Sequence, residues 1–163
     1  MEKIVDMIAI DPGFHSGVAA FLTGCDKPAA VGMLRAPNKK DPLWDRVEFL
    51  LVQMDVLMSG LIEQFDISSK CRVLIEYPAF FSGSGGRMTA ARGDLVKLAF
   101  ITGALAAHIS GLQLTIVPVE VSAWKGQLSK KHVNERIKKL IQMEFADHIA
   151  DAVGIGLWDR GVF

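Results

Sequence analysis

Short apolar runs separated by turn residues open the chain and predict strands. Residues 4–11 form an apolar run that ends at Asp11-Pro12-Gly13, a sequence typical of a turn. Two further runs, at residues 17–22 and 29–34, lie on either side of a turn at residues 24–28. Three strands in succession at this spacing favour an antiparallel meander.

The rest of the chain alternates helices with strands. Apolar residues recur at three- and four-residue steps in residues 43–62, which indicates an amphipathic helix. The elements predicted after it are a strand at 72–77, a Gly/Ser-rich loop at 81–92, a helix at 93–109, a strand at 112–117 and helices at 131–145 and 147–158. This order predicts an α/β fold in which helices cover a five-stranded mixed sheet, with residues 1–163 as a single domain.

The long uncharged stretch at residues 98–119 raises the alternative of a membrane span. His108, Gly111 and Pro118 interrupt it, and Gly111 falls where a helix is expected to end. We therefore expect a buried helix followed by a buried strand, and no membrane partner.

The charge balance limits the partners that the whole molecule attracts. The 163 residues contain 18 Lys and Arg and 18 Asp and Glu, for a formal net charge of +0. A strongly basic protein attracts nucleic acid through its overall field, so any nucleic-acid site here has to be a local basic patch. Two cysteines, Cys25 and Cys71, make no disulfide framework, which favours a reducing compartment.

Acidic residues stand at positions that the predicted fold can bring together. Asp11 ends the first strand, Glu76 ends the fourth, and Asp147, His148 and Asp151 fall within an arc of about 100° on the last helix. Each has an ordinary explanation when taken singly: a turn residue, a solvated strand end, or an acid in the first turn of a helix.

If the first and fourth strands are neighbours, Asp11 and Glu76 meet at the same edge of the sheet. A cluster of carboxylates resists ionisation unless a cation compensates it. Oxygen ligands with one imidazole suit Mg²⁺ or Mn²⁺ better than Zn²⁺. Two such ions would activate water and stabilise the leaving oxygen in phosphodiester hydrolysis.

Basic and aromatic side chains on predicted loops and helix ends make a candidate DNA surface. The basic residues are Arg87, Arg92, Lys97, Lys125, Lys130 and Lys131, which would neutralise phosphates without selecting a sequence. Phe80 and Phe81 either stack on unpaired bases or anchor their loop to the core. We expect Trp124 and Trp158 to pack in the interior, and we find no partner for His15.

An ordered set of motifs resembles the RuvC-type Holliday junction resolvases, which have the RNase H-like fold. The motifs are Ile8-Ala9-Ile10-Asp11-Pro12-Gly13 with Ser16-Gly17, Leu74-Ile75-Glu76, Lys97-Leu98 with Gly103-Ala104, the basic segment at 121–131, and His148-Ile149-Ala150-Asp151-Ala152. They follow the family's order over nearly the whole chain. The basic segment is most similar to the phage-type branch.

The resemblance implies a homodimer that binds a four-way DNA junction in the cytoplasm of a bacterium or a phage-infected cell. Each subunit would cut one strand with Mg²⁺, or Mn²⁺ as a substitute, and leave 5′-phosphate and 3′-hydroxyl ends. The metal ligands and catalytic residues it implies are Asp11, Glu76, His148 and Asp151. Asp147 beside His148 leaves the fourth ligand open. Phe80 is displaced by about one position from the family's junction-probing aromatic residue.

Other functions fit parts of the same pattern. The hairpin around Asp11-Pro12-Gly13 is similar to the phosphate hairpin of the actin and sugar-kinase type, but that fold needs two such domains. A non-catalytic junction-binding module would have no reason to keep all the acids. An RNase H-like nuclease that acts on structured RNA or on other branched DNA stays open.

Overall fold

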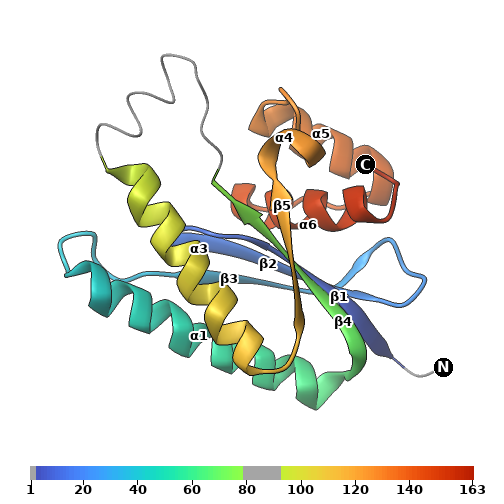
Figure 1. The fold of residues 1–163 in the computed structure, drawn as a ribbon. Helices are drawn as coiled ribbons and strands as arrows, with labels where there is room; N and C mark the ends of the chain where they lie inside the picture. The colour runs from blue at the N-terminus through green and yellow to red at the C-terminus, as the bar shows by residue number, and fades with distance from the viewer. Residues whose placement is uncertain (1–2, 79–92) are drawn as a thin grey trace.

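A five-stranded sheet forms the centre of the computed structural model, which describes residues 3–78 and 93–163 (Figure 1). The strands are β1 (Ile4–Asp11), β2 (His15–Leu22), β3 (Pro28–Arg35), β4 (Asp66–Tyr77) and β5 (Thr115–Glu120), in the spatial order β3-β2-β1-β4-β5. The first three strands pair antiparallel, and β4 runs parallel to both β1 and β5. The predicted meander and the predicted mixed sheet are both confirmed.

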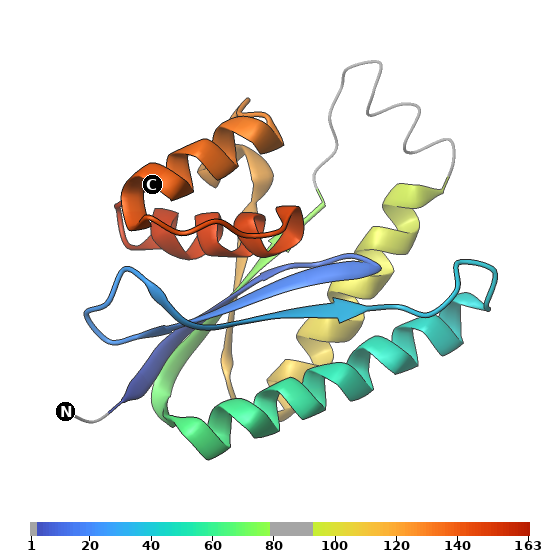
Figure 2. The same ribbon diagram turned by 180° about the vertical axis from the view of Figure 1, so that it is seen from behind.

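Helices cover both faces of this sheet (Figures 1 and 2). The helices α1 (Leu43–Gln64) and α3 (Asp94–Gly111) lie on one face, and α5 (Lys130–Ile141) and α6 (Asp147–Asp159) lie on the other. The single turn α4 (Val121–Trp124) follows β5 directly.

Alternation along β1 assigns its side chains to the two faces. Ile8 and Ile10 pack in the core under α1 and α3, whereas Met7 and Ala9 pack in the core under α5 and α6. Successive strand residues point to opposite faces. The next residue in the second series, Asp11, therefore belongs to the face that α6 covers.

Several predicted boundaries were wrong. Strand β4 begins at Asp66 rather than at residue 72. The last strand is Thr115–Glu120 rather than residues 112–117, and Pro118 lies inside it, opposite Ile75. Because β5 is an edge strand, one of its sides has no neighbour and a proline is tolerated there. The helix predicted at 131–145 ends at Ile141, where Gln142 adopts a left-handed conformation with φ 58° and ψ 37°. The turn α4 was not predicted.

Helix α3 has the length and composition of a membrane span, and within the described residues it alone does. Its buried residues, Ile101, Leu105 and Ile109, pack in the core with α1 and the sheet. The predicted buried helix is confirmed, but the prediction of a buried strand after it was wrong, because β5 lies at the edge of the sheet and Val119 is its only buried residue. The helix is buried on one face only, since Val96 on it is 70% exposed.

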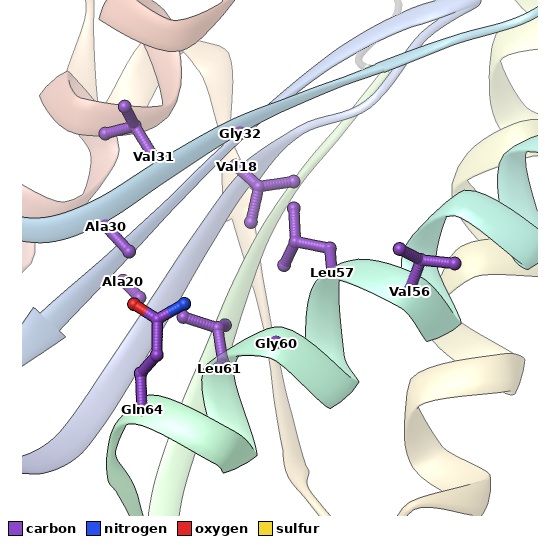
Figure 3. Close-up of a pocket in the computed structure, with 10 residues that line it drawn as sticks. All are labelled: Val18, Ala20, Ala30, Val31, Gly32, Val56, Leu57, Gly60, Leu61 and Gln64. Atoms are coloured by element: carbon purple, nitrogen blue, oxygen red, sulfur yellow. The ribbon is translucent and has the colours of Figure 1, made fainter.

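A shallow apolar groove of about 170 Å³ lies between α1 and the outer strands (Figure 3). Leu57 and Leu61 of α1 face Val18 and Ala20 of β2 across it, and Gln64 supplies a polar end. Helix α1 belongs to the face of the sheet opposite α6, so this groove and the carboxylates described below lie on opposite faces.

Candidate active site

Two neighbouring parallel strands bring Asp11 and Glu76 to the same end of the sheet. Ala9 of β1 lies opposite Leu74 of β4, and two residues further along come Asp11 and Glu76. Ala9 and Leu74 both pack in the core under α5 and α6, so the two acids face that layer as well. Asp11 is only 7% exposed.

A glycine on β2 lets helix α6 approach these strand ends. Gly17 pairs with Asp11, and a Cβ atom placed on Gly17 would lie 1.9 Å from the carbonyl oxygen of His148. That distance leaves no room for any side chain, because the obstacle is backbone. Gly17 therefore sets the distance between the first turns of α6 and the end of β1.

The first turns of α6 carry His148 and Asp151 into the site. The Nδ1 atom of His148 is 2.8 Å from Oδ2 of Asp11, and Asp151 is only 6% exposed. The ring of His15, at the start of β2, is stacked on that of His148 with 6.2 Å between centroids. Residues from β1, β2, β4 and α6 thus meet at one end of the sheet.

Two adjacent residues after β5 bind two of the carboxylates. The indole N–H of Trp124 donates to Oε2 of Glu76 over 2.8 Å. The Nζ atom of Lys125 is 2.9 Å from both carboxylate oxygens of Asp151. The Trp124 side chain is buried, and the Lys125 side chain is 14% exposed.

The proximity of these acids changes how readily they ionise. Burial, and then the nearby charge of Asp11, raise the pKa of Glu76 from 4.5 to about 7. Burial also raises the pKa of Asp11, and the charge of Asp151 raises it further. The hydrogen bond to Asp11 raises the pKa of His148. Asp11 and Asp151 therefore lie close enough to Glu76 for their charges to oppose its ionisation.

The donor set matches a hard divalent cation in kind. Carboxylate oxygens with one imidazole are ligands that suit Mg²⁺ or Mn²⁺, and a positive charge would relieve the repulsion among the acids. Within residues 3–78 and 93–163, no three His, Cys, Asp or Glu side chains lie close enough together to hold a metal ion in the described arrangement. Each buried acid is instead bonded to a protein partner.

The other predicted ligand and DNA-contact residues are spread more widely. Asp147 is exposed, and its Oδ1 accepts from Asn134 of α5, so the structure brings His148 and not Asp147 to Asp11. The Nζ atom of Lys130 lies 4.0 Å from Oδ2 of Asp147, at the rim of the site. Lys131 is highly exposed on α5, and Lys97 on α3 pairs with Asp94 at 3.3 Å.

The predictions for Phe80, Phe81, Arg87 and Arg92 fall outside the described residues. Among the described residues, sequence reasoning missed three contacts. Trp124 is buried, as expected, but it also binds Glu76, and Lys125 binds Asp151 rather than standing free for a phosphate. The stacking of His15 on His148 was also missed, since no sequence spacing relates these two residues.

Comparison with known proteins identifies the fold. No protein-family model matches the chain, and no curated protein matches it in sequence. Among solved structures, the chain is similar to T. thermophilus RuvC in complex with a Holliday junction substrate, with 15% identity, 96% of each chain covered and a TM-score of 0.64. The chain has a RuvC-like fold. In this RuvC-like fold, the acids lie at the carboxyl ends of β1 and β4 and on the last helix.

Proposed function

We propose that this chain is a divalent-cation-dependent endonuclease that resolves four-way DNA junctions as a homodimer. The observation that carries the proposal is the meeting of Asp11, Glu76, His148 and Asp151 at one end of a RuvC-like fold. The structural neighbour is a RuvC bound to a Holliday junction, which supports junction DNA as the substrate.

The chain's own residues would divide the chemistry among them. Asp11, Glu76, His148 and Asp151 would hold Mg²⁺, or Mn²⁺ in its place. The cation would neutralise charge on the phosphodiester and supply an activated water when bound. The Nδ1 atom of His148 lies 2.8 Å from Oδ2 of Asp11, and this hydrogen bond would keep the carboxyl group of Asp11 oriented. Burial of Asp11 and Asp151 limits competing water around the reacting phosphate.

A groove beside the site offers lysines to the DNA backbone. It encloses about 570 Å³ next to the first turn of α6, and its three lysines, Lys130, Lys131 and Lys138, each pair with an acid that also lines it, Asp147, Glu135 and Glu144 in turn. Lysines in such a position neutralise phosphates without contacting bases. The net charge of zero limits this attraction to the groove and its surroundings.

Helix α3 offers a surface for the proposed homodimer. The small residues Ala99, Gly103 and Ala107 recur every fourth position and are exposed, beside exposed Val96. Positions four apart lie on one face of a helix, so backbones of two copies can approach closely there. A junction has two strands to cut, which requires two active sites.

The test compares substrates at equal protein concentration. We expect the protein to nick a mobile four-way junction in Mg²⁺ and to leave a linear duplex of the same sequence largely uncut. EDTA should abolish cutting. Faster cleavage of structured RNA than of junction DNA would instead favour the ribonuclease alternative, and no cleavage of any nucleic acid would refute the nuclease proposal.

A further inference from the structure

Two acids of the site are held by a segment that is not part of the proposed ligand set. Trp124 and Lys125 are consecutive in the chain, yet they bind acids on two different elements, Glu76 on β4 and Asp151 on α6. These acids lie far apart along the chain. One dipeptide therefore joins the sheet side of the site to its helix side.

The position of this segment is fixed by packing. Strand β5 runs parallel to β4, so the chain leaves the sheet at the same end as Glu76 and enters the single turn α4. The Trp124 ring lies against Gly154 of α6, where a Cβ atom would be only 2.6 Å from ring atom Cζ3. The backbone N–H of Lys125 closes the turn by donating to the carbonyl of Val121.

The ion pair between Lys125 and Asp151 is unusual for a purely structural contact. Both side chains are almost withdrawn from solvent, with 14% and 8% exposed. Removing two charges from water is costly, and buried ion pairs often stabilise a fold less than apolar residues of the same size. The ammonium group is a cation that both Asp151 oxygens face. It thus supplies positive charge to an acid that the proposed function assigns to a divalent cation.

We propose that the Trp124–Lys125 pair is a built-in counter-charge: Trp124 fixes Glu76, and Lys125 neutralises Asp151 until a divalent cation displaces its ammonium group. This inference rests on the proposed function, since it needs a cation site at Asp151. Lys125 and Trp124 are positioning residues, and Lys125 sets how much cation is needed to load the site. Trp124 keeps its hydrogen bond to Glu76 throughout.

The test measures cation binding directly, with Mn²⁺ titrated calorimetrically into the intact protein without DNA. Lys125→Met keeps the aliphatic stem and removes the competing charge, so we expect Mn²⁺ to bind at least about tenfold more tightly than in wild type. A merely structural defect would weaken Mn²⁺ binding. Tighter binding in Lys125→Met therefore indicates a lost counter-charge, and weaker binding indicates a structural defect. Lys125→Arg should restore affinity to near the wild-type value. Lys139→Met, which removes the same charge from an exposed position on α5, should leave affinity unchanged.

A second pair of variants tests the other half of the segment. Trp124→Phe loses the donor to Glu76 but keeps most of the ring, and we expect about tenfold weaker Mn²⁺ binding. Trp158→Phe on α6 is the matched control and should bind Mn²⁺ as wild type does. If Lys125→Met fails to fold, Trp124→Phe and Trp158→Phe still test the proposal, and Mn²⁺ affinity that is equal in both would overturn the role of Trp124.

The failure of this inference is distinguishable from the failure of the proposed function. Mn²⁺ binding that is unchanged or weaker in Lys125→Met, with a wild type that binds Mn²⁺, overturns the counter-charge alone. Absence of Mn²⁺ binding in wild type and in both lysine variants overturns the cation site itself, and the counter-charge with it.

Discussion

Replacing Gly17 by alanine tests how the fold builds the site, without touching any proposed ligand. The added Cβ atom would lie 1.9 Å from the carbonyl oxygen of His148, 2.3 Å from its carbonyl carbon and 2.7 Å from the nitrogen of Ile149. Real Cβ atoms essentially never come within 3.0 Å of another heavy atom, so β2 and α6 must separate by about 1 Å. The obstacle is backbone, and no rotamer change can relieve it.

The consequences follow from that displacement. His148 contacts Asp11 at 2.8 Å, so a separation of about 1 Å breaks this hydrogen bond and misplaces Asp151 on the same helix. A displacement of that size lowers a catalytic rate by about 10²-fold. Overpacking of this kind costs about 1–3 kcal/mol of folding free energy, and for this chain length each kcal/mol lowers Tm by about 2–4 °C.

The assay is single-turnover junction cleavage in Mg²⁺ with saturating protein, together with thermal unfolding. Gly60→Ala on α1 is the control, since nothing lies within 4 Å of a Cβ there and alanine favours a helix by about 0.5–1 kcal/mol. We expect the control to cut at the wild-type rate with an equal or higher Tm. A Gly17→Ala protein that folds stably and cuts at the wild-type rate would refute the close approach of α6 as the feature that builds the site.

Three further predictions concern stability, assembly and DNA affinity. The pKa of Glu76 is raised from 4.5 to about 7, so the free energy of unfolding of the cation-free protein should fall by up to about 3 kcal/mol as pH rises through that range. Glu76→Gln should remove this fall, so urea unfolding in EDTA at pH 8 should show the variant to be more stable than wild type. Equal stability of the two proteins at pH 8 would contradict the prediction. Nothing lies within 4 Å of a Cβ atom placed on Gly103, so Gly103→Glu should leave Tm unchanged. It should convert the proposed dimer to a monomer in analytical ultracentrifugation, and a stable dimer would place the interface elsewhere. Lys130→Ala and Lys131→Ala should each weaken junction binding and reduce the salt slope by about 1, and an unchanged slope would remove that lysine from the phosphate contacts.

Much of the fold could be predicted from local patterns, because the buried strands and amphipathic helices repeat with clear periods. The positions of Asp11 and Glu76 followed as well, since both end buried strands whose carboxyl ends meet if the strands are parallel neighbours. The errors lie where a single residue determines the end of a helix or the extent of a strand. Gln142 ends α5 in a left-handed conformation, and Pro118 is tolerated because β5 has only one neighbour.

The finer geometry of the site depends on contacts between distant segments. A helical wheel places Asp147 and His148 at the two ends of an arc of about 100° that also contains Asp151, and it cannot choose between them. The close contact of Gly17 with the backbone of α6 sets the rotation that turns His148 toward Asp11. The contacts of Trp124 and Lys125 depend in the same way on the packing of the indole ring against Gly154, which no local sequence pattern reveals.

The central claim is that acids from β1, β4 and α6 form one cation-dependent active site for junction cleavage. The most direct measurement is Mg²⁺-dependent nicking of a four-way junction by Asp11→Asn, Glu76→Gln and Asp151→Asn, each compared with wild type at matched junction occupancy. We predict that every one of these variants binds the junction and fails to cut it, whereas Asp66→Asn, at the other end of β4, cuts normally. Near wild-type cutting by any of the three acid variants would contradict the claim for that residue, and cutting by all three would end it.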